Sequence, residues 1–150
     1  MPTQFEKYNP SEKLVKLKPN KKKYQTSREK KKGGQEEKEK KEALEVVRKN
    51  GYVLRNVSKK MQNDKEVVLE AIKQYGPALQ HASKELQDDK EVVLKAVERD
   101  GSALYYTSER LRDDKEIVLK AIRKHRDVLY CASERLRNDP EIIEAAGKER

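Results

Sequence analysis

The sequence predicts an all-α protein: a short α-solenoid of four 25-residue helical hairpins plus a closing helix, preceded by an extended basic N-terminal tail. Three segments align without gaps at a period of 25 residues, namely EVVLEAIKQYGPALQHASKELQDDK from Glu66, EVVLKAVERDGSALYYTSERLRDDK from Glu91 and EIVLKAIRKHRDVLYCASERLRNDP from Glu116. The charge is divided unevenly. Residues 1–33 hold 11 of the 36 Lys/Arg but 3 of the 27 Asp/Glu, so the tail carries +8 of the net charge of +9.

Two weaker copies flank the three clear ones. KEALEVVRKNGYVLRNVSKKMQNDK starts at Lys41, and EIIEAAGKER starts at Glu141 and stops after one helix. A single 25-residue hairpin buries too few side chains to offset its conformational entropy, so neighbouring copies must share surfaces, as in a solenoid. We therefore expect a basic, flexible tail (1–33), a charged linker (34–40) with a hinge at Gly33-Gly34, a repeat domain (41–147) and a C-terminal end (148–150).

The first helix of each hairpin is marked by an acidic start and a glycine end. Asp64, Asp89, Asp114 and Asp139 each precede an apolar helical pattern, where a short carboxylate caps free backbone N–H groups. In the second copy the pattern predicts a helix over 65–75. We expect Gly51, Gly76 and Gly101 to end these helices, since a C-terminal glycine tolerates positive φ. Glu42 occupies the position of Val67, Val92 and Ile117, which predicts a more polar first helix.

The second helix of each hairpin is predicted over 77–87 in the second copy. Leu79, Ala82, Ser83 and Leu86 lie at i, i+3, i+4 and i+7, which is one helical face. A serine recurs at this position in every hairpin, and we interpret it as structural. Its hydroxyl is expected to bond a helix carbonyl or the nearby capping aspartate.

The phrases EVVLEAI, GPALQHASKEL and DDKEVVLKAV resemble the repeat of the family known as domain of unknown function 4116 (DUF4116). The resemblance covers 41–147 and implies a small all-helical repeat module, usually found in tandem. It implies no activity. Arg126 replaces the glycine of the pattern, so the fourth turn is expected either to be tighter or to join two partly continuous helices.

No residue pattern in the chain predicts catalysis. His81 and His125 occupy different repeat positions without further ligands at metal-binding spacing, and Cys131 has no adjacent base. The Asp88-Asp89 and Asp113-Asp114 pairs are better explained by helix capping. We expect a non-enzymatic protein without cofactor, metal or small-molecule substrate.

Two rows of residues on the second helices vary between copies while the core does not. One row reads Arg55, Gln80, Tyr105, Tyr130, and its neighbour reads Asn56, His81, Tyr106, Cys131. Exposed tyrosines are enriched at protein interfaces. Tyr105, Tyr106, Tyr130 and His81 are therefore the candidate protein-binding residues. The alternative is that Tyr105 or Tyr130 covers the seam between repeats.

The tail is the second candidate site, because basic side chains neutralise phosphates and aromatic rings stack on bases. The alternatives are a nuclear import signal and a solvated charge run. The candidate nucleic-acid-binding residues are Lys13, Lys16, Lys18, Lys21, Lys22, Lys23, Tyr24, Arg28, Lys30, Lys31 and Lys32.

These patterns predict a binding module whose solenoid contacts a protein partner and whose tail contacts RNA, DNA or another acidic surface. The alternative is a structural subunit of a large ribonucleoprotein or viral particle with the tail threaded into it. With one cysteine, no apolar signal-peptide core and no apolar run of about 20 residues, we expect an intracellular protein, cytoplasmic or nuclear, outside the membrane.

Overall fold

The structure is a computed structural model that describes residues 30–147. Within this range the chain is helical and contains no strand, which confirms the predicted all-α repeat fold. The long helices are α2 (Lys30–Lys49), α4 (Lys65–Gln74), α6 (Lys90–Arg99), α8 (Lys115–Lys124) and α10 (Pro140–Gly147). The 3-10 helices are η2 (Gly51–Asn56), η3 (Gly76–His81), η4 (Gly101–Tyr106) and η5 (Arg126–Cys131). The short helices are α3 (Lys59–Gln62), α5 (Lys84–Gln87), α7 (Glu109–Arg112) and α9 (Glu134–Arg137).

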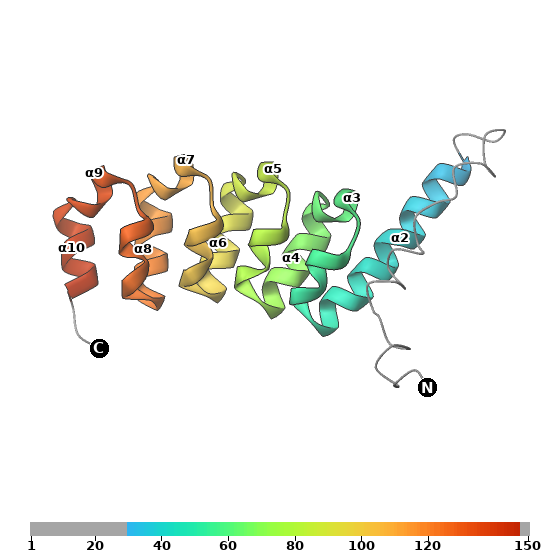
Figure 1. The fold of residues 1–150 in the computed structure, drawn as a ribbon, viewed down its shortest axis with the longest axis horizontal. Helices are drawn as coiled ribbons and strands as arrows, with labels where there is room; N and C mark the ends of the chain where they lie inside the picture. The colour runs from blue at the N-terminus through green and yellow to red at the C-terminus, as the bar shows by residue number, and fades with distance from the viewer. Residues whose placement is uncertain (1–29, 148–150) are drawn as a thin grey trace, which may run out of the picture.

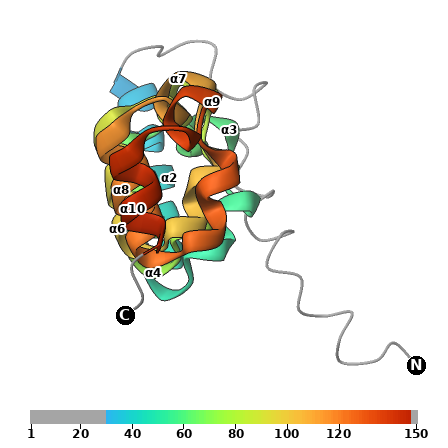
Figure 2. The same ribbon diagram turned by 90° about the vertical axis from the view of Figure 1, so that its left-hand side faces the viewer.

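The elements form a single elongated array (Figure 1), in which each long helix packs on the long helix of the next repeat. Figure 2, a view along the array, shows α4, α6, α8 and α10 stacked on one side, with the 3-10 segments on the other. The short helices line the edge that joins these two layers. Each of η2, η3 and η4 contacts the long helices on both sides of it in sequence, so neighbouring repeats share one core.

The predicted aspartate caps are confirmed. Asp114 Oδ1 accepts hydrogen bonds from the backbone N–H groups of Glu116 (3.0 Å) and Ile117 (3.3 Å). The capping residue is also bound across the repeat boundary, because Lys90 Nζ lies 2.8 Å from Asp114 and 3.0 Å from Glu116. The same arrangement recurs at each joint, with Lys40, Lys65 and Lys115 each bridging the aspartate and glutamate at the start of the following helix.

The prediction of one continuous second helix per hairpin is wrong. In the second repeat the chain forms η3, becomes extended at Ala82 (φ −70°, ψ 161°), and begins a new helix, α5, that is capped by Ser83. The Ser83 hydroxyl accepts from the backbone N–H of Leu86 at 3.3 Å, which is an N-cap interaction. Leu79, Ala82 and Leu86 are nevertheless buried, as their spacing predicts.

A buried glutamine donates hydrogen bonds to carbonyl groups at this break. The Gln87 side-chain amide donates to the carbonyl oxygens of Leu79 (3.1 Å), Gln80 (3.2 Å) and Ala82 (3.1 Å). Gln62 does the same for Leu54 and Arg55 in the first repeat. These bonds fix the angle between the 3-10 segment and the short helix.

The recurring serines are structural, but their acceptors differ from those predicted. The Ser83 hydroxyl donates to Asn63 Oδ1 of the preceding repeat at 2.6 Å, rather than to a helix carbonyl or the capping aspartate. Its backbone N–H donates to the carbonyl of Gln62 at 2.9 Å. Both bonds cross the boundary between repeats, and Ser108 and Ser133 repeat them with Asp88 and Asp113 as side-chain acceptors. Ser83, Ser108 and Ser133 therefore each cap a helix and join two repeats.

The repeat glycines are required by packing, and they do not adopt the positive φ that a helix-ending glycine tolerates. No described glycine has a positive φ. Instead, a Cβ on Gly51 would lie 2.1 Å from the carbonyl oxygen of Ala71, and one on Gly101 would lie 2.3 Å from that of Ala121. Only glycine allows the starts of η2, η3 and η4 to approach the next long helix so closely.

Arg126 does not change the fourth turn, so neither predicted alternative for this turn is correct. His125 has φ −139° and ψ 105°, close to the −147° and 102° of Tyr75 at the equivalent position, and η5 follows as in the other repeats. Arg126 is exposed, and within the described residues α10 packs mainly on α8 and α9, whereas η2, η3 and η4 each pack on the long helix that follows them. A side chain is tolerated where no long helix covers the site.

The expected hinge at Gly33-Gly34 lies inside helix α2, which runs without a break from Lys30 to Lys49. The expected linker over 34–40 is therefore helical. In Figure 1, α2 extends beyond the rest of the array. Lys60 of α3 forms an ion pair with Glu36, which ties this extension to the first repeat.

The core is one cluster of buried side chains from Ala43 to Ile142. Its last layer is open: Ile143 is 52% exposed, whereas Val68, Val93 and Val118 at the equivalent positions are 0% exposed. Each of these valines is covered by a following repeat. Between residues 30 and 147, no helix has the length and apolar character needed to cross a membrane.

Candidate protein-interaction face

The variable rows lie together on one layer of the array. Row positions such as Arg55 and Tyr105, or His81 and Tyr106, stand near the ends of the 3-10 helices, and η2, η3, η4 and η5 contact one another in order. We name the surface formed by these helices and the adjoining short helices the 3-10 face. The repeat places side chains of different chemistry at equivalent points along it.

The three predicted tyrosines form one cluster at the C-terminal half of this face. The rings of Tyr105 and Tyr130 meet edge to face at 5.4 Å, and their hydroxyl groups are hydrogen-bonded to each other. Tyr106 lies 6.3 Å from Tyr105 and packs partly against the core. Tyr105 is 38% and Tyr130 59% exposed. Both rings are thus available at the surface while they also contact each other.

His81 belongs to a second aromatic cluster. Its ring meets Tyr52 edge to face at 5.8 Å, and Tyr52 meets Tyr75 at 6.0 Å. The guanidinium of Arg55 lies 4.9 Å from the centre of the Tyr52 ring, within the range of a cation–π contact, and also donates a hydrogen bond to its hydroxyl. His81 Nε2 is buried without a hydrogen-bond partner. Burial lowers the pKa of His81, and the nearby Arg55 and Lys59 lower it further.

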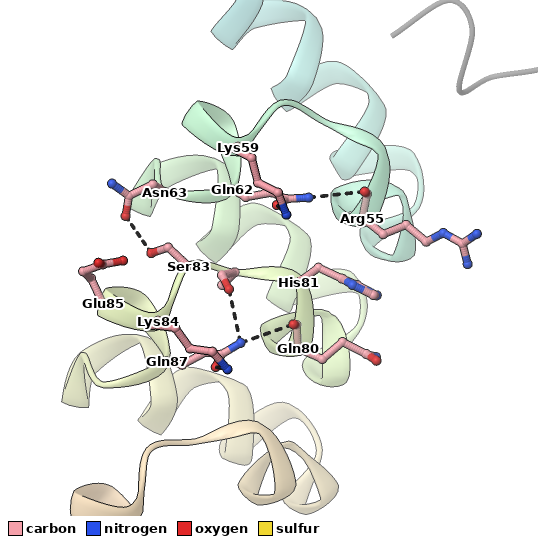
Figure 3. A pocket seen from close by; sticks show the side chains of 11 residues that line it. Arg55, Lys59, Gln62, Asn63, Gln80, His81, Ser83, Lys84, Glu85 and Gln87 are labelled. Atoms are coloured by element: carbon pink, nitrogen blue, oxygen red, sulfur yellow. Dashed lines mark hydrogen bonds between the residues drawn. The ribbon is translucent and has the colours of Figure 1, made fainter. Parts of the chain in front are cut away.

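An open polar groove lies between the first two repeats on the 3-10 face. Figure 3 shows that it is bounded by η2 and α3 on one side and by η3 and α5 on the other, with Lys59 and Lys84 at equivalent points on its walls. Arg55 and His81 extend from the two 3-10 helices at one end. Ser83 and Glu85 lie toward the other end.

Tyr52 was not among the predicted site residues, and Arg55 was predicted only as a member of a variable row. Position 52 is tyrosine in the first repeat alone, since the equivalent residues are Pro77, Ser102 and Asp127, and it therefore forms no aromatic row. The available signal was the spacing of Tyr52 and Arg55, which stacks a cation on an aromatic ring one 3-10 turn away.

Cys131 lies beside Tyr130 of the tyrosine cluster, and the side chains of these two residues are hydrogen-bonded. Burial raises the pKa of the Cys131 thiol, which disfavours a nucleophilic thiolate. His125 Nε2 lies 3.1 Å from Asp100 Oδ1 at a turn between repeats. Across residues 30–147, no cluster of three or more His, Cys, Asp or Glu side chains has the geometry to hold a metal ion.

Most of the predicted nucleic-acid-binding residues lie outside the described part of the chain. This applies to Lys13, Lys16, Lys18, Lys21, Lys22, Lys23, Tyr24 and Arg28. The backbone of Lys30, Lys31 and Lys32 forms the first turn of α2.

Comparison with known proteins identifies the repeat. A model of the family described as Domain of unknown function (DUF4116) matches the chain twice, over residues 41–87 and 89–137. No curated protein and no solved structure matches the chain. The two matched segments cover the hairpins from α2 to α9 and more than half of the chain, so the protein belongs to the DUF4116 family.

Proposed function

We propose that the protein is a non-enzymatic binding module, in which the 3-10 face contacts a protein partner and the basic tail contacts RNA, DNA or another acidic surface. The observation that carries the proposal is the contrast between the two layers. The side chains that join the repeats recur from copy to copy, whereas the exposed rows of the 3-10 face change from Arg55 to Gln80, Tyr105 and Tyr130. Variable side chains on a regular scaffold are typical of binding surfaces.

The tyrosine cluster is the best-suited contact point on this face. Tyr105 and Tyr130 hold each other in place through their rings and hydroxyl groups, so a partner would order little additional side-chain motion on binding them. Large rings with a polar tip contribute strongly to interfaces. By contrast, exposed lysines of the long-helix layer, such as Lys90 and Lys115, are held in ion pairs with neighbouring repeats.

The role of the tail is supported by its composition. With +8 of the net charge of +9 in residues 1–33, and with Phe5, Tyr8 and Tyr24 between the basic residues, the tail has the chemistry that binds phosphates and unstacked bases.

The protein-binding role is tested by comparing two tyrosines of equal exposure. Tyr105 and Tyr75 are both 38% exposed, but only Tyr105 lies in the predicted cluster. Proteins captured by the full chain are identified, and the affinity of the purified partner is measured for the wild type, Tyr105→Ala and Tyr75→Ala. Tyr105→Ala should weaken binding by at least about tenfold, as expected for an interface anchor, while Tyr75→Ala should not. Equal affinity of all three proteins would refute the assignment.

The tail is tested by the salt dependence of RNA binding, with the full chain and a truncated chain that begins at Gly34. About eight phosphate contacts should weaken binding by several orders of magnitude between 50 and 200 mM salt. Binding that is insensitive to salt, or that is retained without residues 1–33, would contradict the polyanion role.

A further inference from the structure

The groove between the first two repeats concentrates positive charge that has no carboxylate partner in the groove. Arg55 bonds the Tyr52 hydroxyl, and Lys59 Nζ and Lys84 Nζ lie 3.0 Å from the amide oxygens of Gln62 and Gln87. These partners are uncharged. They position the three cations without neutralising them, unlike Lys65 and Lys90 at the starts of the long helices, which bridge two carboxylates each.

The other residues that line the groove leave it with a net positive charge. Glu85 is the carboxylate among the groove-lining residues. Arg55 and Lys59 act on His81 at a distance, since both lower its pKa in addition to the effect of burial. A neutral His81 next to three cations leaves the groove with a net positive charge at neutral pH. Such a groove favours an anionic group, either carboxylate or phosphate.

The charge reverses at one position of the same face, while Arg112 and Arg137 keep basic side chains on the short helices of the third and fourth repeats. The position of Lys59 and Lys84 is taken by Glu109 in the third repeat and by Glu134 in the fourth, and all four residues are exposed. A nucleic acid that followed the 3-10 face would bring its phosphates against Glu109 and Glu134. A polypeptide can change its side chains from acidic to apolar or basic over this distance, so the face fits a peptide better.

The spacing of the repeats fits an extended peptide. Packed helices lie about 8–10 Å apart, and an extended chain advances about 3.3 Å per residue. One repeat therefore corresponds to about three residues of an extended segment. The groove lies between the first two repeats and the Tyr105–Tyr130 cluster between the last two, so a segment of about six residues would reach from one to the other.

We propose that the groove lined by Arg55, Lys59 and Lys84 binds acidic side chains of an extended segment of the protein partner, which continues along the 3-10 face to Tyr105 and Tyr130. This assignment rests on the proposed protein-binding function and adds the chemistry of the bound segment. Acidic residues lie at one end of the segment, and apolar or basic residues follow three to six positions away. The groove sets the orientation of the partner on the array.

The two histidines provide a direct test, because the sequence contains only His81 and His125. The probe is a short peptide with consecutive glutamates flanked by glycine and serine, added to the full-length protein, and its all-glutamine counterpart is the control. Imidazole and backbone amide NMR signals are followed during the titration. The glutamate peptide should shift the signals of His81 and of residues around Lys59 and Lys84, and His125 should not move. The glutamine peptide should leave all of them unchanged.

A matched pair of charge variants separates the groove from general electrostatic attraction. Lys59→Gln/Lys84→Gln removes two cations from the groove, and Lys73→Gln/Lys95→Gln removes two from the long-helix layer, where these lysines lie near Glu70 and Glu98. The first pair of substitutions should weaken the affinity of the glutamate peptide, measured from the shift of the His81 signal, about tenfold. The second pair should have no effect. All four lysines are at the surface, and the retained dispersion of the amide signals verifies that each variant is folded.

Three outcomes would overturn the proposal. The glutamate peptide could perturb only the tail, or shift His81 and His125 equally, or bind more weakly than a short oligouridylate that shifts His81 and the cluster at Tyr130. The last outcome would assign the face to nucleic acid. Failure of the proposed function is distinguishable: a Tyr105→Ala variant with full partner affinity would refute the tyrosine contact even if the glutamate peptide occupies the groove.

Discussion

The packing of glycine against the next repeat makes a quantitative prediction for Gly101→Ala. The added Cβ would lie 2.3 Å from the carbonyl oxygen of Ala121 and 3.0 Å from the Cβ of Lys124, whereas ordinary contacts lie between 3.4 and 4 Å. Helix α8 and the start of η4 must therefore separate by about 1 Å, against the close packing of the core. Gly101 is buried, so the strain cannot be relieved toward solvent.

The magnitude follows from two opposing terms. Overpacking of this kind destabilises a folded protein by about 1–3 kcal/mol. Alanine also restricts the unfolded chain, which offsets less than about 1 kcal/mol of this loss. We expect a net loss of about 2 kcal/mol, which corresponds to a decrease in Tm of about 10 °C for a domain of this size. Urea and thermal unfolding followed by circular dichroism at 222 nm would measure both quantities.

Other substitutions separate packing from backbone conformation. A Cβ added to Gly34 would have no atom within 4 Å, and this glycine lies inside α2, so Gly34→Ala should stabilise the protein by about 0.5–1 kcal/mol. Asparagine tolerates positive φ better than alanine does. Gly101→Asn should nevertheless be at least as destabilising as Gly101→Ala, because both add a Cβ. Wild-type stability of Gly101→Ala, or a clearly milder effect of asparagine, would refute the packing argument.

Three further predictions concern the end of the array, a buried amide and a histidine. Val118→Lys should destabilise the protein by more than about 3 kcal/mol, because it buries a charge. Ile143→Lys, at the equivalent exposed position, should change the stability by less than about 0.5 kcal/mol. Urea unfolding of both variants measures the difference. Gln87→Leu should destabilise the protein by about 1–3 kcal/mol, because it removes the side-chain donor to the buried carbonyl oxygen of Ala82, and an unchanged urea midpoint would contradict this role. For His81, burial and then Arg55 and Lys59 lower the folded-state pKa, so the unfolded chain binds the proton more tightly. The free energy of folding that neutral His81 contributes is present in full above its ordinary pKa of 6.5 and is lost as the pH falls below that value. Tm should therefore decrease more between pH 7.5 and 5 in the wild type than in His81→Gln.

The sequence period predicts the array and the stacking of its rows, but it does not predict the break in each second helix. Leu79, Ala82 and Leu86 have the spacing of one helical face, and they are buried whether or not the helix is continuous. The signal for the break is Ser83, which has the side chain of an N-cap in the middle of the apparent helix. A capping residue inside an apolar pattern competes with the pattern, and here the cap and the Gln87 amide determine the local structure.

The candidate site was predictable only where it follows the period. Tyr105 and Tyr130 are 25 residues apart, so their contact follows from the stacking of equivalent positions. The contact of His81 with Tyr52 joins different repeat positions and depends on the orientation of side chains. The packing role of the glycines was not predictable from the pattern of a single repeat either. The close approach between Gly101 and Ala121 forms only where two adjacent repeats meet.

The identical lysine bridges have a consequence for the length of the array. Lys65 reaches the aspartate and glutamate at the start of α6 as Lys90 reaches those at the start of α8. Removal of residues 91–115 would join Lys90 to Glu116 and restore every element of this joint. The shortened protein would place Gln80 next to Tyr130 and His81 next to Cys131. Recombination between repeats can therefore shuffle the surface chemistry of the molecule while its internal joints stay the same.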